Sequence, residues 1–359
     1  MDSTLQHSDS GTSIDAAEKP LWKKIVEPFV ILLMSPFLRR RFLFYLVAGF
    51  MAISINFFLP RMMPGDPVQL IFAQFQGRLD PRAQEALMET YGFLDGPLHE
   101  QYFAYLGSLL RGDLGPSVMN FPVPVTQVIV GSLGWTLRLA GLAAILSFTI
   151  GTLLGIMAAW RRGGVIDSYL LPIMSIMGAF PYFFIALLAL YFFGFQLDLV
   201  PTSHAYDTAI RQQDWGSPEF LLSVLEHGML PMLTIIVTAV GGWMLGMRNN
   251  MISVLSQDYI VLAEAKGLSN RRVMLLYAAR NAILPALTGF AMSIGFVIGG
   301  SLLTEIVFSY PGMGYTLLQA VNRRDYQVMQ GIFLMITFTV LIANFLADIG
   351  YVLLDPRAR

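Results

Sequence analysis

Six long stretches of this chain contain no Asp, Glu, Lys or Arg, and these stretches constrain its fold more than any other feature. A bilayer core about 30 Å thick is crossed by about 20 apolar residues of helix. We therefore predict an all-α, polytopic membrane protein with six transmembrane helices. The predicted spans are Phe42–Pro60, Leu139–Trp160, Ser168–Leu197, His227–Met247, Asn281–Thr304 and Tyr326–Ala347.

The composition agrees with a membrane protein and excludes several kinds of site. Hydrophobic residues make up 55% of the chain and charged residues 13%, against about a quarter charged in an ordinary soluble domain. Cysteine is absent, which excludes disulfides and thiolate metal sites. The four histidines are scattered, so we expect no metal site and no cofactor. The formal net charge of −1 gives no sign of nucleic-acid binding.

The distribution of Lys and Arg predicts the orientation. With six spans and a cytoplasmic N-terminus, 15 of the 23 basic residues fall on the inner side and 7 on the outer side, and Arg138 lies at the start of the second span. Loops rich in Lys and Arg are retained in the cytoplasm. We therefore expect both termini, including residues 355–359, to be cytoplasmic.

The residues before the first span are expected to lie in the cytoplasm or at the membrane surface. Residues 1–20 are polar and without periodicity, which predicts a disordered tail. Residues 21–38 contain an apolar run that is interrupted by a glutamate and two prolines and is too short to cross a bilayer. An interfacial elbow helix is the favoured interpretation, and a seventh span is the alternative. Residues 39–60 should form the first span, as a retained anchor.

The third span contains two prolines, Pro172 and Pro181. Because proline lacks a backbone N–H, we expect a kink in this helix. Phe180, Pro181 and Tyr182 lie at the second proline and are candidates for a translocation path or gate, together with Glu305 near the end of the fifth span. Aromatic side chains in this span could stack on sugar rings, but packing and lipid contact are the simpler explanation.

Residues 61–131 form an outer segment that is too long to be a simple turn. The sequence predicts two short helices in it, one that begins after Asp80 and one that runs from Pro97 to Gly112. Each of these helices has one apolar face. This face could pack against the outer ends of the spans or dock a partner protein, and the two roles are compatible. The residues on that face of the second helix are Tyr102, Tyr105, Leu106 and Leu109.

Residues 248–283 form the longest inner loop, and their pattern predicts a helix, a stop and a second helix. Gly267 can end the first helix in the left-handed conformation, and Ser269 can cap the second. Pro285 should open the fifth span. A protruding helix pair of this kind could dock into a groove of a cytoplasmic protein or lie on anionic lipid, and the pattern fits both. The first helix has its apolar residues at Ile252, Leu255, Tyr259 and Leu262.

Motifs for catalysis are missing from the sequence. It has no Gly-x-x-x-x-Gly-Lys-Ser/Thr phosphate loop, no Gly-x-Ser-x-Gly elbow and no His-Glu-x-x-His helix. We expect a non-catalytic chain, for which energy from ATP must arrive through a partner. An ion-coupled secondary transporter is the alternative, and it needs ionisable groups at mid-depth. Glu305 and Asp348 are its candidates, although each lies near a span end, where a charged side chain can reach the interface.

Glycine pairs at small-x-x-x-small spacing predict close helix packing, with a moving helix contact as the functional alternative. The pairs are Gly151 and Gly155, Gly242 and Gly246, and Gly295 and Gly299.

A series of motifs from about residue 39 to the end resembles the ABC importer inner-membrane permeases, in the branch of dipeptide, oligopeptide and nickel permeases. The inner loop has the strongest matches, which are Asp258-Tyr259, Ala263-Glu264-Ala265-Lys266-Gly267-Leu268, Arg271-Arg272 and Arg280-Asn281-Ala282-Ile283-Leu284-Pro285. Other matches, in the order of the family, include Pro64-Gly65-Asp66-Pro67, Arg111-Gly112-Asp113-Leu114-Gly115, Pro311-Gly312-Met313-Gly314, Arg324-Asp325-Tyr326 and Asp355-Pro356-Arg357.

The resemblance implies the type I ABC importer permease fold, with residues 132–354 as its five-helix core, and a B-type subunit in a bacterial inner membrane. Its partners would be a C-type permease subunit, two cytoplasmic ABC ATPase subunits and an extracytoplasmic solute-binding protein. The chain would be the translocation subunit of a binding-protein-dependent importer. Its substrate would be a peptide or a similar small solute such as an oligosaccharide or nickel.

The resemblance also implies that the inner loop is a coupling helix seated in a groove of an ATPase. Two positions depart from the family pattern. Val261-Leu262-Ala263 stands where the broader importer motif has Glu-Ala-Ala, and position 327 is Gln where the branch usually has Pro. The residues expected to contact or position the ATPase are Tyr259, Ala263, Gly267, Leu268, Arg271, Arg272 and Pro285.

Overall fold

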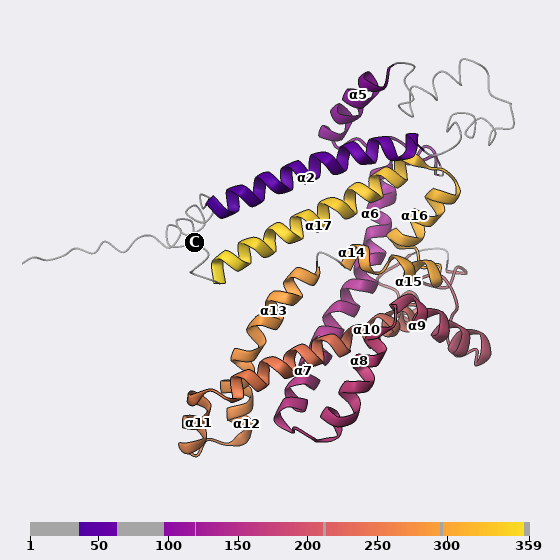
Figure 1. Cartoon of the computed structure of the whole chain (residues 1–359). Helices are drawn as coiled ribbons and strands as arrows, with labels where there is room; N and C mark the ends of the chain where they lie inside the picture. Colours follow the sequence, from indigo (N-terminus) through magenta and orange to yellow (C-terminus); the bar gives the residue numbers. More distant parts are fainter. Residues whose placement is uncertain (1–35, 63–96, 119, 211–212, 295–296, 355–359) are drawn as a thin grey trace, which may run out of the picture.

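The computed structural model describes residues 36–62, 97–118, 120–210, 213–294 and 297–354. In these residues the regular secondary structure is helical, apart from one isolated β-bridge between Pro116 and Pro124 (Figure 1). The predicted tail 1–20, nearly all of the predicted elbow 21–38 and the predicted helix after Asp80 lie outside the described residues.

The first half of the described chain contains α2 (Pro36–Arg61), α5 (Leu98–Leu110), α6 (Val125–Thr136), the π-helical turn η1 (Leu137–Gly141), α7 (Leu142–Trp160), the π-helical turn η2 (Ile166–Leu170), α8 (Leu171–Ala179), α9 (Tyr182–Ala189) and the π-helical turn η3 (Leu190–Gln196). The second half contains α10 (Pro218–Leu255), α11 (Asp258–Ala265), α12 (Asn270–Arg272), the π-helical turn η4 (Val273–Ala279), α13 (Arg280–Ile294), α14 (Val297–Gly300), α15 (Leu302–Val307), α16 (Met313–Asn322) and α17 (Tyr326–Leu354).

Five helical segments are long and apolar enough to cross a membrane, and a bent pair of segments makes a sixth span if it is counted as one. The predicted all-α fold with six spans is therefore confirmed for the described residues. The five are Leu38–Leu59, Val125–Trp160, Pro218–Leu255, Asn270–Ser293 and Tyr326–Leu346, and the bent pair joins Ile166–Ala179 to Tyr182–Gln196.

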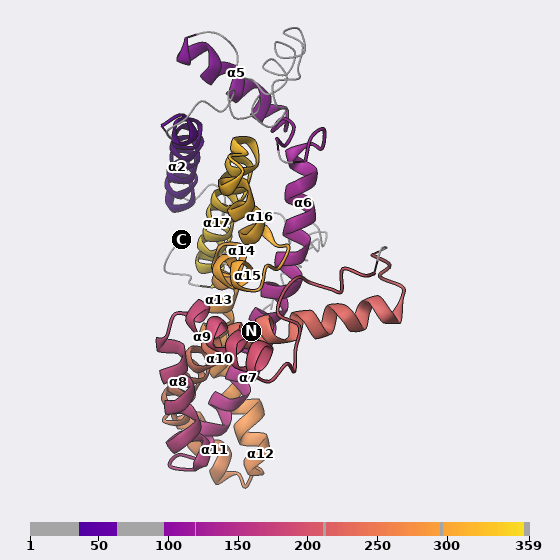
Figure 2. The ribbon, with the colours of Figure 1, turned by 90° about the vertical axis from the view of Figure 1, so that its right-hand side faces the viewer.

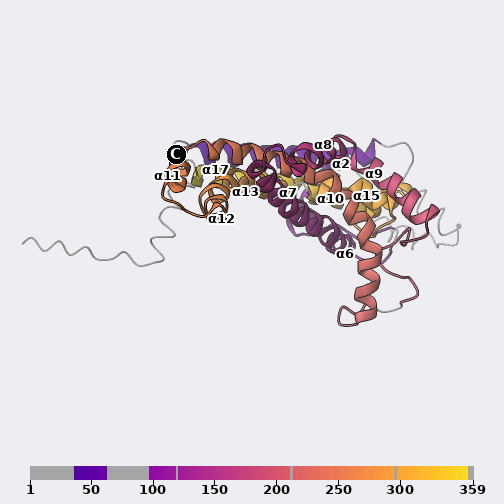
Figure 3. The same cartoon turned by 90° about the horizontal axis from the view of Figure 1, so that it is seen from below.

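The predicted bounds of the second and fourth spans were too narrow. The second helix begins at Val125 and continues through Arg138 to Trp160, and the fourth covers Pro218–Leu255. A charged residue interrupts a charge-free window in the sequence but does not end a helix, so these helices continue past the apolar run. Figures 2 and 3 show that the N-terminal part of α10 projects sideways from the other helices. Pro231 lies inside α10 and removes one backbone hydrogen bond there.

The fifth span lies earlier in the chain than predicted. It covers Asn270–Ser293 rather than 281–304, so Pro285 lies inside α13 and does not open the helix. Glycine is common after Ile294, and glycine weakens helices by about 1 kcal/mol per residue relative to alanine. Of the residues predicted to complete the span, 297–300 form the short helix α14 and 302–304 belong to α15.

The expected kink in the third span occurs at only one of its two prolines. Phe180 is extended, with φ −80° and ψ 142°, and α9 begins immediately after Pro181. The two halves of the span are bent by 100°. This agrees with the restriction that proline imposes on the preceding residue. Pro172 lies in the first turn of α8, directly after a π-helical turn, and the chain stays helical there.

The predicted close packing occurs at one glycine pair. A Cβ atom on Gly155 would lie 2.6 Å from the carbonyl oxygen of Met244, and one on Gly151 would lie 2.6 Å from the Cβ of Trp243. The backbones of α7 and α10 therefore meet here. A Cβ atom on Gly242 or Gly246 would have no neighbouring atom of another described segment within 4 Å, so for this pair the predicted packing within the chain was wrong.

Helices α2 and α17 lie side by side in Figure 1, and polar contacts join them near both ends. Asn56 donates a hydrogen bond of 2.9 Å to the carbonyl oxygen of Gln330, and the Gln330 side chain donates one of 3.1 Å to the carbonyl oxygen of Asn56. Near the other end, Asp348 contacts Arg41 and Tyr45.

Helix α5 confirms the second short helix of the outer segment. Its N-cap is Pro97, and Gly112 follows it in the left-handed conformation with φ 74°. The rings of Tyr102 and Tyr105 pack on Phe57 of α2, with centroid distances of 5.1 and 5.4 Å. The apolar face thus packs against the end of the first span, which is the simpler of the two roles expected for it.

Candidate functional site

The connection between α10 and α13 is a compact hairpin, and it is shorter than the predicted loop. Helix α10 continues to Leu255, and the fifth span begins with α12 at Asn270. The predicted single helix over residues 252–262 is divided by a turn at Ser256 and Gln257. In this turn the Ser256 hydroxyl donates to the carbonyl oxygen of Ser253 at 2.9 Å, and Gln257 is extended with ψ 145°. The apolar spacing did not reveal this break.

Gly267 ends α11 as predicted. It has φ 72°, its N–H donates to the carbonyl oxygen of Glu264 at 2.8 Å, and the N–H of Leu268 donates to that of Ala263 at 3.3 Å. These two bonds form a Schellman motif, which satisfies carbonyl groups at a helix end and suits glycine. Ser269 then precedes α12 in the extended conformation as its N-cap residue, but its hydroxyl makes no capping hydrogen bond.

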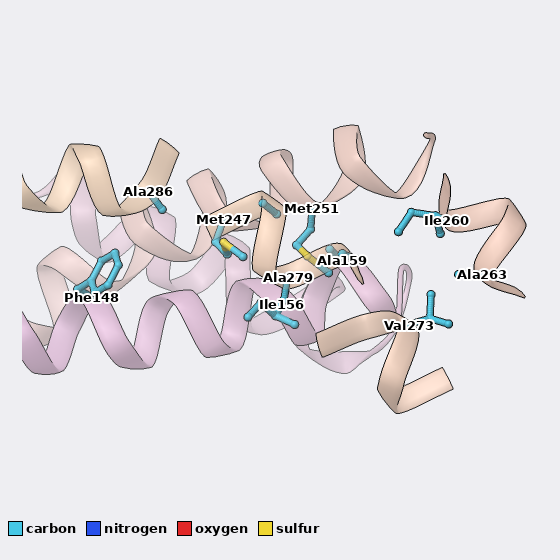
Figure 4. Close-up of a cluster of buried hydrophobic side chains, with 12 residues drawn as sticks. Phe148, Ile156, Ala159, Met247, Met251, Ile260, Ala263, Val273, Ala279 and Ala286 are labelled. Atoms are coloured by element: carbon cyan, nitrogen blue, oxygen red, sulfur yellow. The ribbon is translucent and has the colours of Figure 1, made fainter. Parts of the chain in front are cut away.

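Three of the predicted coupling residues hold the hairpin against the helices. Ala263 is buried, and Leu268 packs against the same apolar cluster, which includes Met251 and Val273 (Figure 4). Tyr259 is half-exposed, and its hydroxyl accepts a hydrogen bond of 3.0 Å from the Asn281 side chain. The contacts of these three side chains fix the position of the hairpin.

The outward surface of the hairpin is apolar and basic. Val261 and Leu262 expose 60% and 55% of their surface, and Arg271 and Arg272 are exposed on the opposite side of the turn. Gly267 is exposed, with open space where a side chain would lie. Pro285 lies inside α13, outside the hairpin. The structure thus brings together six of the seven predicted residues and separates the seventh.

The second predicted site lies where the third span bends. Phe180 and Pro181 are exposed, and Tyr182 begins α9, which packs against α15. Glu305 lies on α15, the helix against which α9 packs. The structure therefore brings the four predicted residues to one region, although Glu305 is fully buried in this chain.

The Glu305 carboxylate is satisfied by groups of its own chain. It accepts hydrogen bonds from the Ser301 hydroxyl at 2.9 Å and from the N–H of Gly314 at 2.7 Å. A Cβ atom on Gly312 would collide with this carboxylate. Next to this carboxylate in the chain's fold, the N–H of Met313 donates a hydrogen bond of 2.8 Å to the Thr136 hydroxyl. Glu305 therefore caps the N-terminus of α16, where a carboxylate is favourable.

Asp348, the other residue considered for ion coupling, forms an ion pair. Its Oδ2 lies 3.4 Å from Nε of Arg41 and accepts a hydrogen bond of 2.8 Å from the Tyr45 hydroxyl. Both partners belong to α2, so the contact joins two spans. Among the described residues no group of three or more His, Asp or Glu side chains could hold a metal ion.

Residues 151–359 match the family model described as the binding-protein-dependent transport system inner membrane component. The chain belongs to this family. Its members are permeases of ABC importers, and the resemblance proposed from the motifs is confirmed. The permease is similar to the di/tripeptide transport system permease protein DppB of Pseudomonas aeruginosa, at 32% identity over 91% of this chain and 99% of the relative.

Two further relatives support the dipeptide and oligopeptide branch. The probable peptide ABC transporter permease protein y4tP of Sinorhizobium fredii is 35% identical over 91% of the permease and 100% of its own length. The oligopeptide transport system permease protein AppB of Bacillus subtilis is 32% identical over 84% of the permease and 92% of its own length. With its apolar helices, this membership makes the permease a multi-pass protein of the inner membrane.

The sequence reasoning missed the partners of Glu305 and one further contact. Ser301 lies four residues before Glu305, and this helical spacing was a usable signal. Gly312 and Gly314 were noted only as part of a motif. Asp167 and Arg248 form an ion pair between segments 81 residues apart, and no local pattern could have indicated it.

Proposed function

We propose that the permease is the translocation subunit of an ATP-driven importer of peptides, coupled to a separate cytoplasmic ATPase through the hairpin of residues 256–269. The peptide substrate is supported by the names of three relatives, each of which the permease matches over most of its length. The resemblance to the branch also allowed an oligosaccharide or nickel as the substrate, and the names of these relatives support neither.

The geometry of the hairpin is the observation that carries the coupling role. A contact that transmits movement must be rigid, and here two Schellman hydrogen bonds and the buried side chains of Ile260 and Ala263 hold the turn. At the same time, Val261 and Leu262 present an exposed apolar surface, and Arg271 and Arg272 are exposed after the turn at Gly267. An apolar face of this kind suits a groove on another protein.

The proposed assembly contains this B-type subunit, a C-type permease subunit, two ATPase subunits and an extracytoplasmic solute-binding protein. The hairpin would face the cytoplasm, as would both termini, in keeping with the 15 to 7 distribution of Lys and Arg. The chain itself would be non-catalytic. The bend at Phe180 and Pro181, beside α15, is the proposed site of the translocation path or gate.

Chemical cross-linking tests the contact with the ATPase. The chain has no cysteine, so Leu262→Cys places a single thiol on the exposed face of the hairpin. In membranes that contain the whole complex, a short thiol-directed cross-linker should join this variant to the ATPase subunit. A matched Ile173→Cys variant, exposed on α8, should give no such product. Equal cross-linking of both variants, or of neither, would show that the hairpin is not the contact.

A further inference from the structure

Asp167 and Arg248 form the best-defined ion pair in the described part of the permease. Arg248 Nε lies 2.5 Å from Asp167 Oδ1, and a terminal guanidinium nitrogen of Arg248 lies 3.3 Å from Oδ2. The N–H of Gly163 donates a further hydrogen bond of 2.9 Å to Oδ2. The Arg248 side chain exposes only 25% of its surface, and the Asp167 side chain only 10%. Bidentate, partly buried pairs of this kind fix orientation as well as distance.

Arg248 lies on the part of α10 that holds the hairpin. Met247 and Met251 are fully buried in the apolar cluster that also contains Ile260 and Val273 (Figure 4). Helix α7 meets the same part of α10, since a Cβ on Gly155 would lie 3.1 Å from the backbone N of Arg248. A displacement of the hairpin must therefore move this end of α10.

Asp167 lies at the start of the broken span. It belongs to η2, which continues without interruption into α8, and α8 ends at the 100° bend at Phe180. Helix α8 also packs along α10, where the Cβ of Gly241 would collide with the carbonyl group of Met174. The ion pair thus joins the end of α10 nearest the hairpin to the segment that leads to the bend.

We propose that Asp167 and Arg248 are positioning residues that make the η2–α8 segment move together with the hairpin. The inference rests on the proposed coupling role of the hairpin and goes beyond it, because it names the contact through which a displacement reaches the bend at Phe180 and Pro181. Loss of either charge leaves the other partly buried and uncompensated, so this end of the η2–α8 segment would then be held to α10 only by the packing of α8 on α10.

A charge exchange tests the pair. Asp167→Arg, Arg248→Asp and the double exchange are compared in the complete complex, reconstituted in proteoliposomes, as substrate transported per ATP hydrolysed. Each single variant should lower this ratio about five- to tenfold, and the double exchange should restore it to within about twofold, since coupling energies of residues in contact are not additive. Arg161→Asp makes a similar charge change at the start of the same loop, and it should leave the ratio unchanged.

Three results would overturn the proposal. They are normal coupling in both single variants, loss that the double exchange does not relieve, and an equal loss in Arg161→Asp. If Asp167→Arg fails to accumulate in the membrane, Asp167→Asn keeps the shape of the side chain and should still lower the ratio. Leu268→Asp separates this idea from the proposed function. Uncoupling by Leu268→Asp with normal Asp167 variants would retain the role of the hairpin and reject that of the ion pair.

Discussion

Glu305 on α15 and Gly314 in the first turn of α16 are joined by a hydrogen bond of 2.7 Å from the backbone N–H of Gly314 to the Glu305 carboxylate, and both residues are buried. The carboxylate occupies the place of a helix cap, although it comes from a different helix. Glu305, which was considered for ion coupling, thus holds α15 and α16 together.

Removal of this carboxylate should destabilise the permease. Glu305→Ala leaves the buried N–H of Gly314 without its acceptor, at a cost of about 1–3 kcal/mol. It also removes the shorter hydrogen bond of the Ser301 hydroxyl, which keeps only a bond of 3.5 Å to the carbonyl oxygen of Val297. Glu305→Gln keeps one acceptor and should cost less. The measurement is the thermal unfolding midpoint of the purified permease, with Glu264→Gln, exposed on α11, as the control. A midpoint unchanged in Glu305→Ala would contradict the capping role.

Gly155 and Gly246 should respond differently to the same added methyl group. Gly155→Ala brings a Cβ within 2.6 Å of the Met244 carbonyl oxygen, and overpacking of this kind costs about 1–3 kcal/mol. Gly246→Ala adds the methyl group in open space inside α10 and should keep or raise the unfolding midpoint, because alanine favours a helix over glycine by about 1 kcal/mol. Equal midpoints for the two variants would mean that α7 and α10 do not approach closely at Gly155.

The conformation of Gly267 predicts which replacements keep the hairpin intact. Gly267→Val forces a β-branched residue to φ 72°, which costs about 1–2 kcal/mol, and should uncouple transport while the protein remains in the membrane. Asparagine tolerates this conformation, so Gly267→Asn should retain most uptake. Uptake by both variants, measured with a radiolabelled dipeptide, should differ severalfold, and normal uptake in Gly267→Val would count against the coupling role.

Asp348 should be important for assembly of the spans and not for energy coupling. Asp348→Asn can still accept the hydrogen bond from Tyr45 but loses the ion pair with Arg41, which is a modest loss because Arg41 is 45% exposed. We expect uptake to persist, and a protonophore to leave it unaffected while ATP is maintained. Abolished uptake in this variant, with a protonophore effect at constant ATP, would instead indicate an ion-driven carrier.

Local sequence patterns predicted the number of spans, the helix of residues 98–110 and the left-handed turn at Gly267. Each depends on residues close together in the chain: an apolar run of sufficient length, proline and glycine at helix ends, or a glycine that needs a positive φ. The same reasoning was wrong for the fifth span, where the charge at Arg280 was taken as its boundary although the helix passes through this residue. Charge marks contact with water and does not end a helix.

The candidate sites were predicted less completely than the spans. The sequence indicated that Ala263 and Leu268 matter, but the structure shows that they face the apolar cluster rather than outward. It indicated three pairs of glycines at helix spacing without showing which helix each glycine would meet. Gly155 approaches α10, whereas Gly246 meets no described residue of this chain. The direction of a helix face depends on its neighbours.

The sequence by itself determined that this chain spans a membrane as helices. Its long charge-free stretches favour lipid over water, and in lipid the backbone N–H and C=O groups must form hydrogen bonds within the helix. It also determined the turn at Gly267, because only the backbone conformation of one residue was required there. The tertiary structure alone decided that Glu305 caps α16, that Asp348 pairs with α2, and that Asp167 meets Arg248. Each of these is a contact between distant segments, and its energy depends on a geometry that local spacing does not specify.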